Sequence, residues 1–262
     1  MKYFAERKSF TLVELMTVIS ILTVLIALTY PAVQAVMNRV HRAKAANNLR
    51  TIALAHAQFI TDFGRAITFS DIKNIGNNTY NANNFAAILA KYGYINDVSV
   101  WAWDFDYKVK AHKNDTSKTF PTEIYNKSIE RTHTHFQGGT FPLSVVCGIV
   151  QCPNFDYKTL LKGKYPAAYS RGLKSNGSWM EFSTNDNGGV FGTKGGLVAY
   201  YDGSVEWCTN TVNKFVKYSD KTKSSKICDA IPNSHKSVEN KNYTDSNFLF
   251  WNAPGHSICC NI

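Results

Sequence analysis

The first 146 residues of this chain contain no cysteine, and all six cysteines lie in the C-terminal half. They are Cys147, Cys152, Cys208, Cys228, Cys259 and Cys260. Their spacing lacks the double CxxC of a structural zinc site, so an oxidising compartment with up to three disulfides is the simpler interpretation. The neighbours Cys259 and Cys260 would be strained if bonded to each other, so we expect at least one of them to pair with Cys208 or Cys228.

Acidic residues are also scarce, with 19 Asp and Glu against 29 Lys and Arg, a formal charge of +10. Residues 1–9 carry three basic side chains and one acidic one, so their removal lowers the charge by two, to +8. A basic surface favours anionic partners such as nucleic acid, acidic polysaccharide or lipid headgroups. A solvated basic surface without a dedicated ligand explains the same composition.

The short motifs of common enzyme classes are absent, including GxSxG, HExxH, the P-loop and the Rossmann glycine fingerprint. We therefore predict that the chain is not an enzyme.

Metal-ligand chemistry is concentrated in His133 and His135, because alternate residues of a strand point the same way. Further ligands could come from His112, or from Asp104 and Asp106. An exposed polar loop without a metal is the favoured interpretation of these residues. The turn 185–188 contains Asp186 and offers oxygen ligands to calcium, although it lacks the spacing of an EF-hand. No other cofactor is expected.

One long apolar run extends from Phe10 to Tyr30, 21 residues with Glu14 as the single charge. As a helix it spans about 32 Å, the thickness of a bilayer core. A cleaved secretory signal is the alternative, since a basic segment precedes the run and Val33-Gln34-Ala35 resembles a cleavage site. The run is longer than the apolar part of such signals and contains a carboxylate. We therefore expect a membrane-spanning helix.

The segment KSFTLVEL at residues 8–15, followed by the apolar run, resembles the leader and helix start of type IV pilins and type II secretion pseudopilins. In that family a prepilin peptidase cuts before the Phe and methylates the new amine, and a glutamate stands fifth in the mature chain. The resemblance implies cleavage between Ser9 and Phe10, with Ser9 in place of the usual glycine. It also implies an assembly role for Glu14.

A carboxylate within a membrane costs about 2.5–3.5 kcal/mol, so Glu14 needs a partner. The hypothesis is that Glu14 pairs with the methylated amine of Phe10 from a neighbouring subunit. Recognition by the peptidase alone is the alternative role.

Pro31 falls where many pilins also carry proline, and it predicts a kink or the end of the membrane span. Apolar residues then recur at helical spacing from Val33 to Ile60, which predicts a helix to about Asp62 with Gly64 as its stop. The expected organisation is a leader at 1–9, a transmembrane half-helix at 10–31, an amphipathic half-helix at 32–63 and a disulfide-bonded α+β head at 64–262.

In the head, a short helix is predicted between a cap at Asn81 and a stop at Gly93, and a polar loop at 108–127. The predicted strands are 98–103, 141–146, 167–171, 179–183, 197–201 and 204–208, with a tight turn at Asp202-Gly203 joining the last two. The fold class is thus α+β and pilin-like, a long N-terminal helix packed against an antiparallel sheet.

Residues 195–205 (GGLVAYYDGSV) resemble the C-terminal motif of a bacterial pilin-like subfamily that carries a histidine ten residues before Asp-Gly. Gly192 takes the place of that histidine, so the histidine's role does not transfer. Cys152-Pro153 also resembles the Cys-Pro that precedes the sheet in those relatives.

The resemblance implies a structural subunit of a type IV pilus-like or pseudopilus filament. Its implied partners are copies of itself or other pilins, prepilin peptidase, an inner-membrane assembly platform and the membrane. The protein is then single-pass with an extracytoplasmic head before assembly, and afterwards part of a periplasmic or cell-surface filament. The alternative is a pilin-anchored surface protein that binds an anionic ligand, DNA or acidic polysaccharide.

Overall fold

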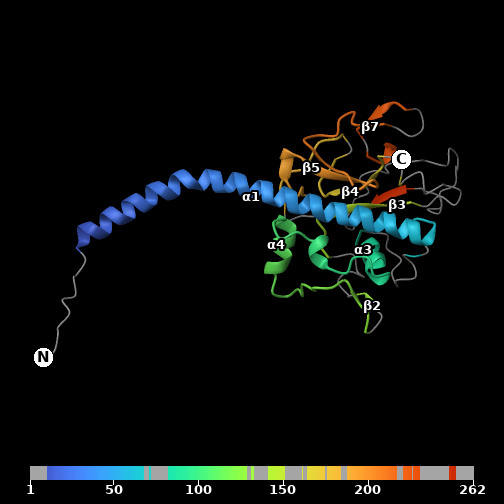
Figure 1. The fold of residues 1–262 in the computed structure, drawn as a ribbon, viewed down its shortest axis with the longest axis horizontal. Coiled ribbons are helices and arrows are strands. Elements are labelled where there is room, and N and C mark those ends of the chain that lie inside the picture. Colours follow the sequence, from blue (N-terminus) through green and yellow to red (C-terminus); the bar gives the residue numbers. More distant parts are fainter. Residues whose placement is uncertain are drawn as a thin grey trace. The chain divides into compact units, whose positions relative to one another are not determined.

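The computed structural model describes residues 11–67, 71, 82–128, 131–132, 141–150, 161, 164–174, 176–183, 188–216, 221–225, 227–230 and 248–251. The chain forms two compact units, an N-terminal unit (Met1–Lys44) and a C-terminal unit (Ala45–Ile262). Helix α1 (Leu12–Phe63) begins in the first unit and ends in the second (Figure 1).

Helix α1 ends where the sequence predicts, at Phe63 before Gly64. Gly64 has φ +64°, a left-handed conformation that glycine adopts without a steric penalty and that terminates helices. The helix passes through Pro31 without ending there. Pro31 therefore does not mark the end of the helix.

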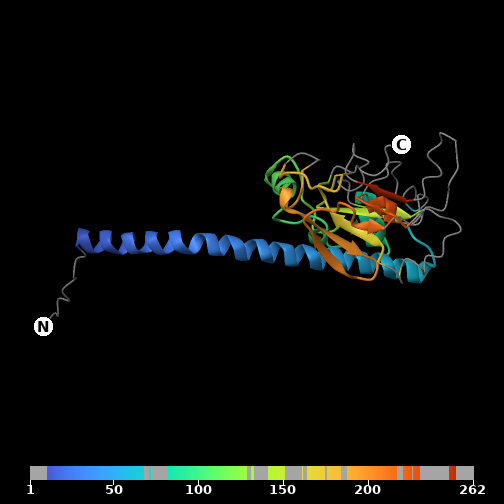
Figure 2. The same cartoon turned by 90° about the horizontal axis from the view of Figure 1, so that it is seen from above.

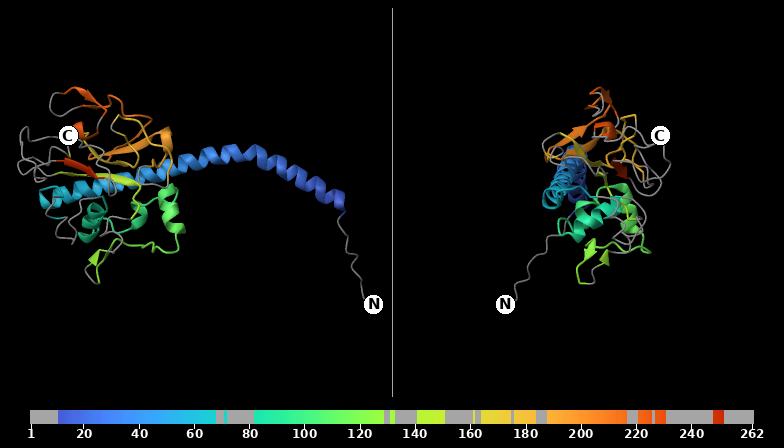
Figure 3. Two further views of the ribbon diagram at one scale, coloured as in Figure 1. Left: turned by 180° about the vertical axis from the view of Figure 1, so that it is seen from behind. Right: turned by 90° about the vertical axis from the view of Figure 1, so that its right-hand side faces the viewer.

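The part of α1 within the C-terminal unit forms one wall of its core. Its buried side chains recur every three or four residues, so they lie on one helix face; they are Ala45, Leu49, Ile52, Ala53, His56, Phe59 and Ile60. The sheet and helix α3 (Ala82–Lys91) lie along this part of α1 (Figures 2 and 3). This is the α+β, pilin-like architecture that the sequence predicts.

Five antiparallel strands form the main sheet in the order β6-β5-β4-β3-β9. They are β3 (Val145–Val150), β4 (Pro166–Ser170), β5 (Gly196–Tyr200), β6 (Val205–Cys208) and β9 (Phe248–Trp251). Every residue of β4 and β5 is buried, as expected for strands inside a covered sheet. The predicted strands at 167–171, 197–201 and 204–208 are confirmed within one residue at each end, and the strand predicted at 141–146 begins four residues later.

The predicted turn between β5 and β6 is also confirmed. Gly203 has φ +79° and donates its N–H to the Tyr200 carbonyl at 3.0 Å. The Asp202 carboxylate accepts from the Ser204 N–H at 2.8 Å. The Asp-Gly pair therefore supplies both the left-handed residue and the side-chain acceptor that a tight hairpin requires.

Short elements complete the described part of the C-terminal unit. They are η1 (Val98–Val100), α4 (Tyr107–Asn114), β1 (Tyr125–Asn126) paired with β2 (Arg131–Thr132), η2 (Gly192–Lys194), β7 (Phe215–Val216) paired with β8 (Lys223–Ser224), and η3 (Ile227–Ala230). Helix α3 confirms the predicted short helix, and Gly93 after it has φ +85°.

Three predictions about the C-terminal unit are wrong. The segment 98–103 forms the η1 turn (Val98–Val100) and irregular backbone instead of a strand. Trp101 and Trp103 are both fully buried, and the Asp97 carboxylate accepts from Ser99 N–H at 2.8 Å. The predicted loop after residue 107 contains α4. The segment 179–183 makes a single bridge, Leu173 to Trp179, instead of a paired strand.

Candidate functional site

The start of α1 is built from a reciprocal cap between Thr11 and Glu14. The Glu14 carboxylate accepts from the Thr11 N–H and the Thr11 hydroxyl, each at 2.9 Å, and the Glu14 N–H donates to the Thr11 hydroxyl oxygen at 3.2 Å. This is a capping box, in which two otherwise unpaired backbone N–H groups at a helix N-terminus find side-chain acceptors. Glu14 thus stabilises the helix start within its own chain.

The other polar side chains of the apolar run bond to the helix that carries them. Hydroxyl groups at residues 17, 20, 23 and 29 donate to backbone carbonyls three or four residues earlier, at 2.7–3.2 Å. Residues 11–40 are all exposed in the isolated chain. The hydroxyl groups of this apolar helix therefore need no water as a hydrogen-bond partner. Such a helix is compatible with lipid or with packed neighbouring helices, because neither supplies water. By length and composition α1 is able to cross a membrane.

The two processing residues, Ser9 and Phe10, lie outside the described residues. The structure therefore brings together Thr11 and Glu14, while Pro31 lies farther along the same helix. Thr11 was not singled out from the sequence. The signal was present, since Thr followed three residues later by Glu before an apolar run is the capping-box pattern.

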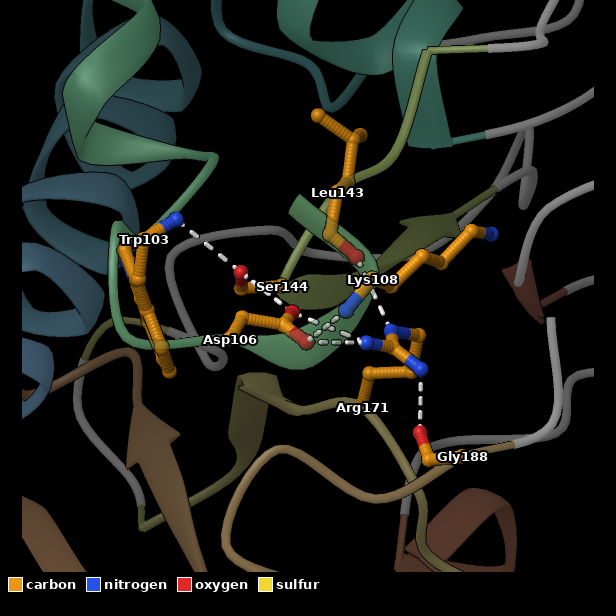
Figure 4. Close-up of polar contacts among 7 residues, drawn as sticks. All are labelled: Trp103, Asp106, Lys108, Leu143, Ser144, Arg171 and Gly188. Carbon is orange, nitrogen blue, oxygen red and sulfur yellow. Dashed lines mark hydrogen bonds and ion pairs between the residues drawn. The ribbon is translucent and has the colours of Figure 1, made fainter. Parts of the chain in front are cut away.

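In the C-terminal unit the most deeply buried charges form a cluster around Asp106 and Arg171 (Figure 4). Both side chains are 1% exposed, and the Arg171 guanidinium donates to the two Asp106 carboxylate oxygens at 2.6 and 2.8 Å. Arg171 also donates to the Leu143 carbonyl at 3.1 Å and to the Gly188 carbonyl. The Ser144 hydroxyl donates to Asp106 at 2.7 Å. Two buried charges are tolerated here because each is paired and hydrogen-bonded.

The Asp106–Arg171 cluster positions helix α4. Asp106 is the N-cap of α4, and its carboxylate accepts from the Lys108 N–H at 3.1 Å, while the Lys108 side chain points away from it (Figure 4). Arg171 follows strand β4, and Gly188 lies in the following loop. One carboxylate therefore joins a helix start to the end of a strand.

Two of the further candidate metal ligands pair with basic side chains. Asp106 is occupied by Arg171, and Asp104 pairs with Lys113. Within the described residues no group of three or more His, Cys, Asp or Glu side chains is arranged to hold a metal ion. His133, His135 and Asp186 lie outside those residues.

A buried histidine on α1 contacts the sheet. The Tyr201 hydroxyl lies 3.0 Å from His56 Nδ1, and the His56 ring packs edge-on against Phe85 at 4.9 Å. His56 Nε2 has no hydrogen-bond partner among the described residues. Burial lowers the pKa of His56 to about 3, and burial followed by the neighbouring Cys147 raises the pKa of Tyr201. The pair is therefore neutral and holds α1 against the end of β5.

Two cysteines correct the disulfide prediction. Cys147 on β3 and Cys208 on β6 are both buried free thiols. Strands β4 and β5 separate them by about 14 Å across the sheet, and Cys208 also lies along β6 from Val205, the residue in register with Cys147. A disulfide requires Cα atoms within about 7 Å. Burial raises the pKa of both thiols. Cys152, Cys259 and Cys260 lie outside the described residues, as does the side chain of Cys228.

Gly192 occupies the position of the histidine in the resembling subfamily. It has φ +61°, and a Cβ added there would lie 2.7 Å from Cε2 of the Phe182 ring. The Phe182 ring fills the space that a side chain at residue 192 would need. A contact between this ring and Gly192 therefore stands where the resembling subfamily has a histidine side chain.

Residues 5–30 match the family model described as the prokaryotic N-terminal methylation motif. This is the prepilin-type signal of type IV pilins and pseudopilins, and it indicates a pilin-like or pseudopilin substrate of prepilin peptidase. Proteins of this kind are structural subunits and not enzymes. No curated protein and no solved structure shows a significant match to the chain.

Proposed function

We propose that the chain is a structural subunit of a type IV pilus-like or pseudopilus filament. In this proposal, prepilin peptidase removes residues 1–9 and methylates Phe10, an inner-membrane platform assembles the subunits, and α1 packs against α1 of other pilins. The observation that carries it is the methylation motif at residues 5–30, joined to a helix that stays exposed and apolar from Leu12 to Val40. The proposed organisation is residues 10–31 in the membrane, 32–63 amphipathic and 64–262 in the head.

The structure sharpens the proposed role of Glu14 in assembly. Its carboxylate caps α1 and is the single acidic group in the apolar run from Phe10 to Tyr30. In a bundle of such helices the methylated Phe10 amine of a neighbouring subunit supplies the opposite charge. Removing one partner of a buried pair costs about 3–5 kcal/mol, so the pair selects the correct register of docked subunits.

Glu14→Gln removes the negative charge but keeps the helix cap, because glutamine also serves as the acceptor in a capping box. We expect this variant to be processed to Phe10 but to be absent from sheared filaments. Thr11→Val is the matched control, since it removes the capping hydroxyl and keeps the charge, and it should still assemble. Mass spectrometry of sheared filaments and membranes measures both the new N-terminus and the location of the chain.

Three results would contradict the proposal at different levels. Glu14→Gln entering filaments at the wild-type level rules out the charge pairing alone. A wild-type chain that starts at Phe10 but stays in the membrane fraction, absent from filaments, favours the second candidate, a pilin-anchored surface protein that binds an anionic ligand. Retention of Met1, or a start at Val36, contradicts the processing itself.

A further inference from the structure

Two aromatic rings stand exposed side by side at the start of α4. Tyr107 is 51% exposed and Phe182 is 47% exposed, and their ring centroids lie 5.1 Å apart at an interplanar angle of 46°. Other aromatic side chains of this unit, including Trp101, Trp103 and Phe141, are fully buried. Two adjacent exposed rings offer an apolar surface on which another flat ring can stack.

Both rings are held by rigid parts of the fold. Tyr107 directly follows Asp106, whose carboxylate is fixed by the buried Arg171. Phe182 lies over Gly192, a position with no space for a side chain. The ring pair is therefore preorganised, and a ligand that uses it loses little conformational freedom on binding.

Lys110 lies beside the ring pair, whereas Lys113 lies over a third ring, Phe120. The Lys110 ammonium lies 6.0 Å from the Tyr107 ring centroid, and Lys110 forms no ion pair among the described residues. The Lys113 ammonium lies 4.4 Å from the Phe120 ring and also pairs with Asp104. Other charges in this part of the chain are Lys118 paired with Asp115, and exposed Glu181 beside Phe182.

We infer that this ring–lysine face, made of Tyr107, Lys110 and Phe182, binds single-stranded nucleic acid. Each nucleotide brings one flat base and one phosphate, which match an exposed ring and a neighbouring ammonium group. Bases inside a duplex are hidden from such rings. A sugar ring also packs on an aromatic ring, through its C–H groups, so an acidic polysaccharide is the competing ligand that the test includes. The net charge of the mature chain, +8, attracts the phosphate backbone.

The test is fluorescence anisotropy of a labelled oligothymidylate with the full chain in mild detergent. The Phe182→Ala variant should weaken binding about 5- to 150-fold, the range for one base–aromatic stack. Lys110→Gln should lower the salt dependence of binding by about 0.7 in the log–log slope, as expected for one phosphate contact. Lys223→Gln, an exposed lysine on β8, is the matched control and should change the slope by less.

Tyr107→Phe keeps the ring and should bind like the wild type. Phe182→Leu keeps an apolar cover over Gly192 but removes the aromatic ring, so it should bind weakly even if Phe182→Ala disturbs the local fold. The inference is wrong if Phe182→Leu binds as the wild type does, if duplex DNA or alginate binds as tightly as the single strand, or if Lys223→Gln lowers the slope as much as Lys110→Gln.

Discussion

His56 is a titratable side chain that the fold buries in the core. It lies among the core positions of α1 and is 1% exposed, with its Nδ1 against the Tyr201 hydroxyl. Because burial disfavours the charged imidazolium, the pKa of His56 falls from 6.5 to about 3. Between these pH values the folded chain binds fewer protons at this site than the unfolded chain does.

The free energy of unfolding should therefore be unaffected by His56 above pH 6.5 and should fall as the pH decreases from about 6.5 to about 3. One proton limits the slope to about 1.4 kcal/mol per pH unit. The measurement is thermal or denaturant unfolding of the full chain in detergent across this pH range. His56→Asn keeps a polar partner near Tyr201 without titrating, and its stability should depend less on pH. Equal pH dependence of the two proteins would contradict the assignment.

Helix α4 depends on one capping residue, Asp106. Its sequence YKVKAHKN is polar and charged, with little apolar periodicity. Asp106 caps its first turn and is itself fixed by Arg171, which follows β4, and by the Ser144 hydroxyl. The helix therefore depends on contacts with residues far away in sequence, and the ring–lysine face that it presents depends on the same cluster.

A double-mutant cycle on Asp106 and Arg171 measures this dependence. Asp106→Asn keeps a capping side chain but removes the charge that compensates Arg171, and it should lower the free energy of unfolding by about 3–5 kcal/mol. Arg171→Met should cost a similar amount because it leaves Asp106 unpaired. The double variant should be less destabilised than the sum of the two, by about 1–3 kcal/mol. Additive losses, measured by denaturant unfolding, would show that the pair is not coupled.

At the scale of the whole molecule, the boundary between the two compact units falls within helix α1, between Lys44 and Ala45. The C-terminal unit begins at Ala45, so the last part of the helix belongs to its core. Leu49, Ile52, Phe59 and Ile60 are each at most 2% exposed. The head expected from the sequence, residues 64–262, lacks all four.

A fragment that begins at Gly64 should therefore fail to fold, whereas a fragment that begins at Lys44 should fold. Loss of a buried Leu, Ile or Phe costs about 2–5 kcal/mol each, so four such losses, about 8–20 kcal/mol together, are as large as the roughly 5–15 kcal/mol by which a domain is stable. Near-UV circular dichroism and cooperative thermal unfolding distinguish the two fragments. Cooperative unfolding of the Gly64 fragment would place the core elsewhere.

Local patterns predicted the local features well. The apolar run, the Glu14 spacing and the Gly64 stop predicted α1, and Asp202-Gly203 predicted the hairpin between β5 and β6. The strand predicted at 98–103 failed because alternation does not reveal that Trp101, Ala102 and Trp103 are all buried. Helix α4 was missed because its cap is stabilised from outside the segment.

The sequence by itself determined the processing motif, the exposed apolar helix and the antiparallel hairpin, because each depends on residues within a few positions of one another. The tertiary structure decided the pairing of Asp106 with Arg171, the neutral state of His56 and the free thiols of Cys147 and Cys208. Charge state and bonding at these positions depend on burial and on partners up to 145 residues away. Such partners meet only when the sheet and α1 close over the core.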